Sequence, residues 1–188
     1  MANGQKIVIV HGTCGSPEGN WFSWLKNELS NLGFDVSVPR FPTPAGQSFA
    51  SWRKVFADMN TQAPDQTILI GHSIGAPFVL RMAEETNAPY NAFLAVCPFA
   101  KTLGIEEFDG LNSTFVDHNF DWPRIKAGAK HRFCFAGDND PYVPLTFSED
   151  VAQKAGATLH VVPGGGHLNA DSGYVTFPQI LEVIKTIR

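Results

Sequence analysis

The residues best suited to chemistry in this chain are a serine, a histidine and an aspartate that stand far apart in the sequence. Ser73 lies in the pentapeptide 71–75, which reads Gly-His-Ser-Ile-Gly, between an apolar run and a helix-like stretch. A serine between a strand and a helix in this motif is typical of a nucleophile elbow. Its hydroxyl is a weak nucleophile until a base takes its proton, so the motif predicts further partners.

The predicted base is His167, which follows the glycine run 164–166. Imidazole can take a proton from the serine and return it to a leaving group. A carboxylate is then needed to orient the imidazole and to stabilise its charged form. Asp138 and Asp140 both follow the same predicted strand, and their spacing does not choose between them. Asp140 precedes Pro141, which restrains its backbone to an extended form.

Two backbone N–H groups are expected to stabilise the oxyanion that forms when the serine attacks a carbonyl. One belongs to Ile74, directly after the nucleophile. The other is expected from Thr13, in the loop His11-Gly12-Thr13-Cys14-Gly15 that follows the first predicted strand. This loop lacks the spacing of a dinucleotide-binding motif, and the remaining histidines lack metal-ligand spacing. We therefore expect a site with no cofactor and no metal.

These residues must be positioned by short apolar runs that alternate with amphipathic stretches, a pattern typical of a parallel sheet covered on both faces. Helical periodicity is expected over about 21–32, 49–59, 76–86 and 177–187, with Leu32 on the buried face of the first stretch. The candidate residues each follow a predicted strand, and parallel strands bind ligands at their carboxyl ends. The expected strands are 6–10, 34–38, 67–70, 92–97, 131–136 and 158–162.

The segment 98–129 is longer than one crossover helix requires. Two interpretations stay open: a short helix near 121–126 that packs as ordinary core, or a small cap or rim over the site, because long connections are often functional. Its aromatic residues, together with Phe41 and Tyr142, are candidates for the lining of a small apolar acyl pocket. Asn112-Ser113-Thr114 has the form of a glycosylation acceptor. Without a secretory leader we interpret it as accidental.

The composition of the chain indicates a single globular domain and argues against several kinds of partner. The 188 residues suit a single domain, 1–188, with 44% hydrophobic and 17% charged residues. The net charge of −4 argues against nucleic acid and against an anionic membrane as partners, and no apolar run approaches the roughly 20 residues of a membrane span. Cys14, Cys97 and Cys134 show no paired spacing, so we expect free thiols and a cytoplasmic location.

Taken together, these segments resemble the small serine hydrolases related to retinoblastoma-binding protein nine and its YdeN-like bacterial relatives. The resemblance spans nearly the whole chain. It implies an α/β architecture, a reduced three-layer α/β-hydrolase fold with about six parallel strands flanked by helices. It also implies that the acid is the aspartate directly before proline, which is Asp140. The resemblance rests on residues 6–12 followed by residues 21–29. It also rests on three short segments: Ile70-Gly71-His72-Ser73, Asp140-Pro141-Tyr142-Val143-Pro144 and Gly165-Gly166-His167.

The expected function is that of a serine hydrolase that cleaves carboxylic esters of small molecules through an acyl-enzyme, with Ser73, Asp140 and His167 as its triad. The expected partner is a small-molecule acyl substrate, and the chain is expected to be a monomer or a weak dimer. No L-x-C-x-E motif occurs, so binding to retinoblastoma protein is not implied. Because one fold hosts many reactions, the alternatives are a peptidase, thioesterase or acyltransferase with the same triad, or a non-catalytic protein-binding module.

Overall fold

The computed structural model describes residues 4–59 and 63–187, and this part of the chain forms one six-stranded sheet. All strands are parallel, in the order β2-β1-β3-β4-β5-β6. The predicted fold class, six parallel strands flanked by helices, is confirmed, and the predicted strands differ from the observed ones only at their ends. The strands are β1 (Lys6–Val10), β2 (Asp35–Ser37), β3 (Thr67–His72), β4 (Tyr90–Val96), β5 (Ala129–Gly137) and β6 (Thr158–Val162).

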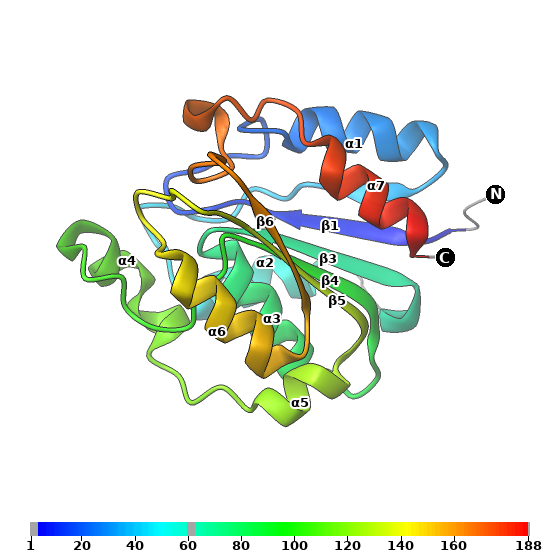
Figure 1. Cartoon of the computed structure of the whole chain (residues 1–188). Coiled ribbons are helices and arrows are strands. Elements are labelled where there is room, and N and C mark those ends of the chain that lie inside the picture. Colours follow the sequence, from blue (N-terminus) through cyan, green and yellow to red (C-terminus); the bar gives the residue numbers. More distant parts are fainter. Residues whose placement is uncertain (1–3, 60–62, 188) are drawn as a thin grey trace.

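Helices cover both faces of the sheet (Figure 1). One face carries α1 (Phe22–Asn31) and α7 (Pro178–Thr186). The other carries α2 (Phe49–Ala57), α3 (Gly75–Glu85), α4 (Glu106–Val116), α5 (Trp122–Ala127) and α6 (Leu145–Ala155). Two short helical turns, η1 (Pro64–Gln66) and η2 (Ala170–Ser172), complete the described elements. Because both faces are covered, β3 and β4 are buried throughout and are apolar over most of their length.

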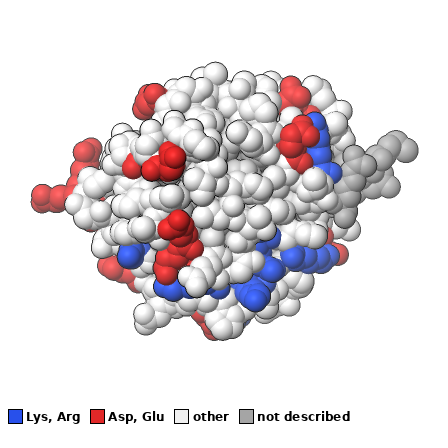
Figure 2. All heavy atoms as spheres, in the orientation of Figure 1, with Lys and Arg blue, Asp and Glu red and all other residues white. Residues whose placement is uncertain are grey.

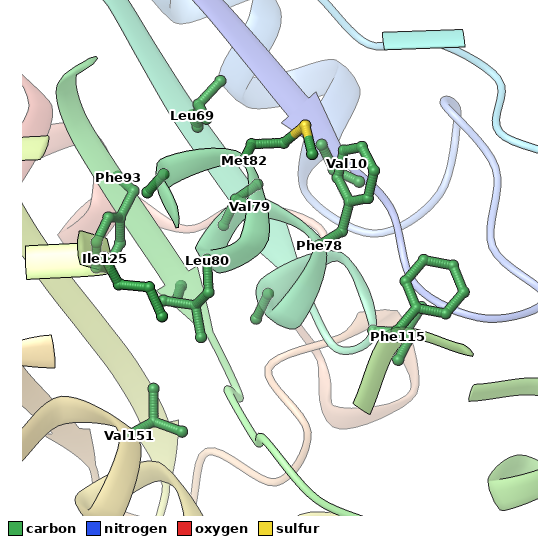
Figure 3. Packing of buried hydrophobic residues seen from close by; sticks show 14 of the residues in the cluster. Val10, Leu69, Phe78, Val79, Leu80, Met82, Phe93, Phe115, Ile125 and Val151 are labelled. Atoms are coloured by element: carbon green, nitrogen blue, oxygen red, sulfur yellow. The ribbon is translucent and has the colours of Figure 1, made fainter. Parts of the chain in front are cut away.

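Alternate residues of the central strands supply the two cores. In β1, Val8 and Val10 pack on the α3 side, whereas Ile7 and Ile9 pack on the α1 side. The larger core surrounds α3 and includes buried residues from β1, β3, β4 and β5 and from α2, α4, α5 and α6, several of which are labelled in Figure 3. Full burial of one such side chain stabilises the fold by about 1.5–3 kcal/mol. This packing holds α3 in place, and α3 begins at Gly75, two residues after Ser73.

The segment 98–129 holds two helices. One of them, α5, corresponds to the short helix that we expected near 121–126, and its Ile125 is fully buried. The other, α4, was not expected, and it places Phe115 and Val116 in the core around α3. The prediction that Leu32 lies on the buried face of the first helix was wrong. Leu32 is 43% exposed, because α1 ends at Asn31 and Leu32 is its C-cap.

Two other features concern the cysteines and the question of a membrane-spanning helix. Cys14, Cys97 and Cys134 are all free thiols, as expected, with Cys14 exposed and the other two buried. Among the described residues, no helix combines the length and the apolar character that crossing a lipid bilayer requires.

Candidate active site

Ser73 occupies a sharp turn between β3 and α3, with a left-handed backbone φ of 57°. The turn depends on glycine at both flanks. A Cβ atom at Gly71 would lie 2.0 Å from the Gly75 carbonyl oxygen, and one at Gly75 would lie 2.5 Å from the Val10 carbonyl oxygen. A Cβ at Gly12 would lie 3.0 Å from Cβ and 3.5 Å from Oγ of Ser73. The serine side chain therefore faces the loop that follows β1.

His167 and Asp140 form a buried hydrogen-bonded pair. The His167 Nδ1 atom lies 2.7 Å from Asp140 Oδ2, and the two side chains are 8% and 2% exposed. Asp140 Oδ1 accepts the N–H groups of Tyr142 at 2.9 Å and Val143 at 3.1 Å. Burial alone would raise the pKa of Asp140, but these hydrogen bonds and the His167 ring outweigh it and hold the pKa below its usual value. The ionised carboxylate keeps the proton on Nδ1, which leaves Nε2 as the basic nitrogen.

Asp138 has a different role from Asp140. Its Oδ1 atom accepts the N–H of Gly164 at 2.7 Å, and Asn139 Oδ1 accepts the N–H of Gly166 at 2.7 Å. These side chains hold the glycine run that carries His167. Of the two aspartates that spacing alone could not separate, the structure places Asp140 against the imidazole and Asp138 against the loop backbone.

His72, directly before the nucleophile, contacts the backbone of the base. Its Nε2 lies 2.9 Å from the His167 carbonyl oxygen, which can only accept, so Nε2 carries the proton. Burial, with a further contribution from His167, lowers the pKa of His72 to about 3, so the ring is neutral. Trp21 Nε1 donates to the next carbonyl, that of Leu168, at 2.9 Å. The His72 donor thus holds the His167 loop against the nucleophile turn, and the Trp21 donor holds it against the start of α1.

The loop after β1 is held by His11. Its Nδ1 donates to the Gly12 carbonyl at 2.8 Å, and its Nε2 accepts the Phe41 N–H at 3.0 Å. The bond from Phe41 requires the neutral ring, because an imidazolium has no nitrogen that accepts, and burial lowers the pKa of His11. Within the described residues, neither the Thr13 nor the Ile74 N–H donates a hydrogen bond. These are the two donors expected for an oxyanion, and Thr13 lines the same pocket as Ser73.

A pocket of about 290 Å³ is lined by Ser73 and His167. One part of its wall is apolar: Leu103 and Phe108 come from the segment 98–129, and Phe108 packs edge-on against Tyr142 with ring centroids 5.7 Å apart. No Lys or Arg is among the lining residues. Figure 2 shows acidic side chains at the left edge of the molecule, where Figure 1 places α4. The polar part of the wall comprises Thr13, Cys14, Asn20, Asn112, Asn169 and Asp171.

The expected aromatic lining of the pocket is correct only in part. Phe108 and Tyr142 line it. Phe41 instead packs in the core against Trp52, with ring centroids 4.7 Å apart. Phe115 also belongs to this core. Phe120 and Trp122 stack on each other and line a separate hollow beside α6. The aromatic content of the segment 98–129 indicated that it contributes to a pocket, but which of its rings line the pocket depends on the fold.

Cys97 lies beside the Asp140–His167 pair and was not expected there. The potential metal-ligating atoms of these three residues all lie within 4.8 Å of one another. Burial, and then the nearby Asp140 carboxylate, raises the pKa of the Cys97 thiol well above its usual value. The thiolate is the form that ligates metals, so the protonated thiol is a poor ligand here, and the Asp140 and His167 atoms are already engaged with each other.

The sequence is similar to a known protein family and to known proteins. A family profile described as serine hydrolase matches residues 7–186. The chain is 30% identical over 184 residues to YdeN of Bacillus subtilis (strain 168), covering 97% of this chain and 95% of that protein. It is 28% identical over 190 residues to the serine hydrolase RBBP9 of Rattus norvegicus, covering 100% and 97%.

Solved structures extend the comparison. The crystal structure of the ydeN gene product aligns with a TM-score of 0.90, covering 97% of this chain and 98% of that one. Est1E from Butyrivibrio proteoclasticus aligns with a TM-score of 0.72 at 16% identity, covering 98% and 90%, which is a likeness of fold alone.

Proposed function

Because the chain belongs to the serine hydrolase family, we propose that it cleaves carboxylic esters of small molecules through an acyl-enzyme on Ser73. The observation that carries the proposal is the 2.7 Å hydrogen bond between His167 Nδ1 and Asp140, in a pocket that Ser73 also lines. A carboxylate, an imidazole and a serine at three strand ends have the roles of a catalytic triad. A module that only binds a partner has no need of this set.

In the first half of the proposed reaction, Ser73 Oγ attacks the ester carbonyl while His167 Nε2 takes its proton. Asp140 stabilises the imidazolium. The Thr13 and Ile74 N–H groups donate to the carbonyl oxygen as it becomes an oxyanion. No hydrogen bond joins Ser73 to His167 in the described part of the chain, and such bonds commonly tighten only when substrate is bound.

In the second half, the imidazolium returns its proton to the leaving alcohol, which departs and leaves Ser73 acylated. A water molecule then loses a proton to His167 Nε2 and attacks the acyl carbonyl. Collapse of this second tetrahedral species releases the carboxylic acid and returns the proton to Ser73. Every step uses groups of this chain and water, so the proposal needs no cofactor.

The pocket supports a small substrate. Its volume of about 290 Å³ is close to the lower limit of the range for small-molecule sites, about 300–1,000 Å³. The apolar wall of Leu103, Phe108 and Tyr142 suits a short acyl chain. We place the activity in the cytoplasm, because the exposed Cys14 thiol in this pocket persists in a reducing compartment.

Turnover of p-nitrophenyl acetate tests the proposal. Ser73→Ala and His167→Ala should each lower kcat by about 10³-fold or more, while thermal unfolding shows that both variants are folded. Ser30→Ala, an exposed serine on α1, is the matched control and should retain full turnover. Unchanged turnover in Ser73→Ala would overturn the proposal.

A further inference from the structure

Asn112 is a pocket-lining side chain, and in the described part of the chain only one half of its amide is hydrogen-bonded. It lies on α4, lines the pocket and is only 3% exposed. Its Oδ1 accepts the Thr13 hydroxyl at 2.6 Å and the Gln47 amide at 3.0 Å. Its Nδ2 donates to no described residue. Because Nδ2 is not one of the fully buried side-chain atoms that lack a partner, it is not completely enclosed. An amide nitrogen without a partner among the described residues therefore remains accessible at the pocket wall.

The hydrogen-bond network fixes which half of the Asn112 amide is bonded and which half is free. Gln47 Nε2 lies 3.1 Å from the Leu111 carbonyl oxygen, which only accepts, so this atom of Gln47 must be the NH2 group. The Asn112 atom that faces the same NH2 group must then be its oxygen. Gln47 is held in turn by the Thr43 hydroxyl, which donates to its Oε1. The free half of Asn112 is consequently its NH2 group, a donor of two hydrogen bonds.

We propose that the Asn112 NH2 group binds an oxygen on the acyl part of the substrate, so that the enzyme prefers short esters of keto, hydroxy or ether acids. The inference rests on the proposed function. Asn112 contacts the side chain of Thr13, whose backbone N–H is the proposed oxyanion donor, so its amide lies on the side of the pocket near the acyl carbonyl. A plain alkyl chain would leave this donor unpaired beside Leu103 and Phe108, which a site built to hydrogen-bond its substrate disfavours.

The burial of Asn112 also settles the role of the Asn112-Ser113-Thr114 sequon. A side chain that is 3% exposed and bonded to Thr13 and Gln47 cannot carry a glycan in the folded protein. The interpretation of the sequon as accidental is consistent with this, and the asparagine is better explained as part of the pocket.

Two isosteric esters test the proposal, p-nitrophenyl pentanoate and p-nitrophenyl β-methoxypropanoate, with kcat/KM corrected for their hydroxide-catalysed rates. The wild-type chain should prefer the ether ester by about tenfold or more. Asn112→Asp keeps an oxygen for Thr13 and Gln47 but removes the donor, and should bring the ratio near unity. Asn119→Asp, an exposed residue outside this pocket, adds the same charge to the segment 98–129 and should leave the ratio unchanged.

A binding measurement keeps the proposal testable without turnover. In ¹⁵N-labelled Ser73→Ala protein, the side-chain NH2 signals that Asn112→Asp removes should shift on titration with methyl β-methoxypropanoate and not with methyl pentanoate. Equal preference for the two esters in the wild type, an unchanged ratio in Asn112→Asp, or unmoved NH2 signals would each overturn the inference. If the NH2 signals shift but the wild-type protein shows no turnover that depends on Ser73, the proposed function alone is contradicted.

Discussion

Asp138 and Asp140 carry the same side chain on the same loop, but they bind different partners. Asp140 contacts the His167 imidazole, and Asp138 accepts a backbone N–H of the loop that carries His167. Asp140→Asn should lower kcat by about 10³–10⁴-fold, because an amide no longer holds the imidazole tautomer or stabilises its charge. Asp138→Asn is the matched control: it keeps an oxygen for the Gly164 N–H and should stay within about threefold of wild type. Steady-state kinetics on one ester measures both. An equal loss in the two variants would contradict the assignment of the acid.

His72 gives the second prediction at this scale. His72→Leu removes the donor to the His167 carbonyl and should lower kcat by about 10- to 100-fold with little change in KM, because the base is misplaced. His72→Gln retains an N–H donor and should recover part of the loss. Kinetics and thermal unfolding of both variants check this. Equal losses of kcat in His72→Leu and His72→Gln would show that filling the space, and not the hydrogen bond, is what matters.

Single residues also show where prediction from the sequence ends. Ser73, His167 and the aspartate pair could be predicted because each lies in the turn or loop that follows a strand, and strand ends meet at one edge of a parallel sheet. The roles of His72 and Asn112 depend on partners 95 and 65 residues away. No periodicity or local motif encodes such a contact, so these residues resemble ordinary polar residues until the chain is folded.

At the scale of elements, the turn from β3 into α3 is the most constrained junction. Gly71→Ala should destabilise the protein by about 3 kcal/mol or more, because its Cβ would overlap the Gly75 carbonyl. Gly110→Ala is the contrast: this glycine lies inside α4 with open space around it, and alanine there should stabilise by about 0.5–1 kcal/mol. Urea unfolding measures both. Similar stabilities for the two variants would mean that the turn relaxes more freely than its geometry implies.

The elements differ in how far the sequence predicts them. β3 and β4 are buried on both faces, so their apolar runs mark them clearly. In contrast, α4 combines Gly110, Asn112, Ser113 and Thr114, residues of low helix propensity. It is stabilised instead by tertiary contacts, including the packing of Phe115 and Val116 and the bonds of Asn112 to distant loops. Such contacts are invisible in a local window of sequence.

At the scale of the whole molecule, two buried neutral histidines predict acid sensitivity. The pKa of His72 is lowered to about 3 and that of His11 is also lowered, whereas both take up protons near pH 6.5 when unfolded. The unfolded chain therefore binds more protons below about pH 6.5, and stability falls as the pH is lowered, by up to about 1.4 kcal/mol per pH unit for each group. Asp140, with its lowered pKa, adds a loss of the same sign at still lower pH.

Urea unfolding at several values between about pH 7 and pH 4 measures this dependence. His72→Gln removes one of the two groups and should make the slope shallower, whatever its effect on stability at neutral pH. A stability that stays constant over this range, or an equal slope in wild type and His72→Gln, would contradict the account of His72 as a buried neutral ring.

The claim on which the account depends is that Ser73 is an activated nucleophile. Mass spectrometry after treatment with a fluorophosphonate tests it most directly, because such probes phosphonylate a serine that an adjacent base has activated. We predict one adduct, on the peptide that contains Ser73, in the folded wild-type protein, with none in Ser73→Ala and none after unfolding in urea. An unlabelled Ser73 in folded protein, or an adduct confined to another residue such as Cys14, would contradict the account.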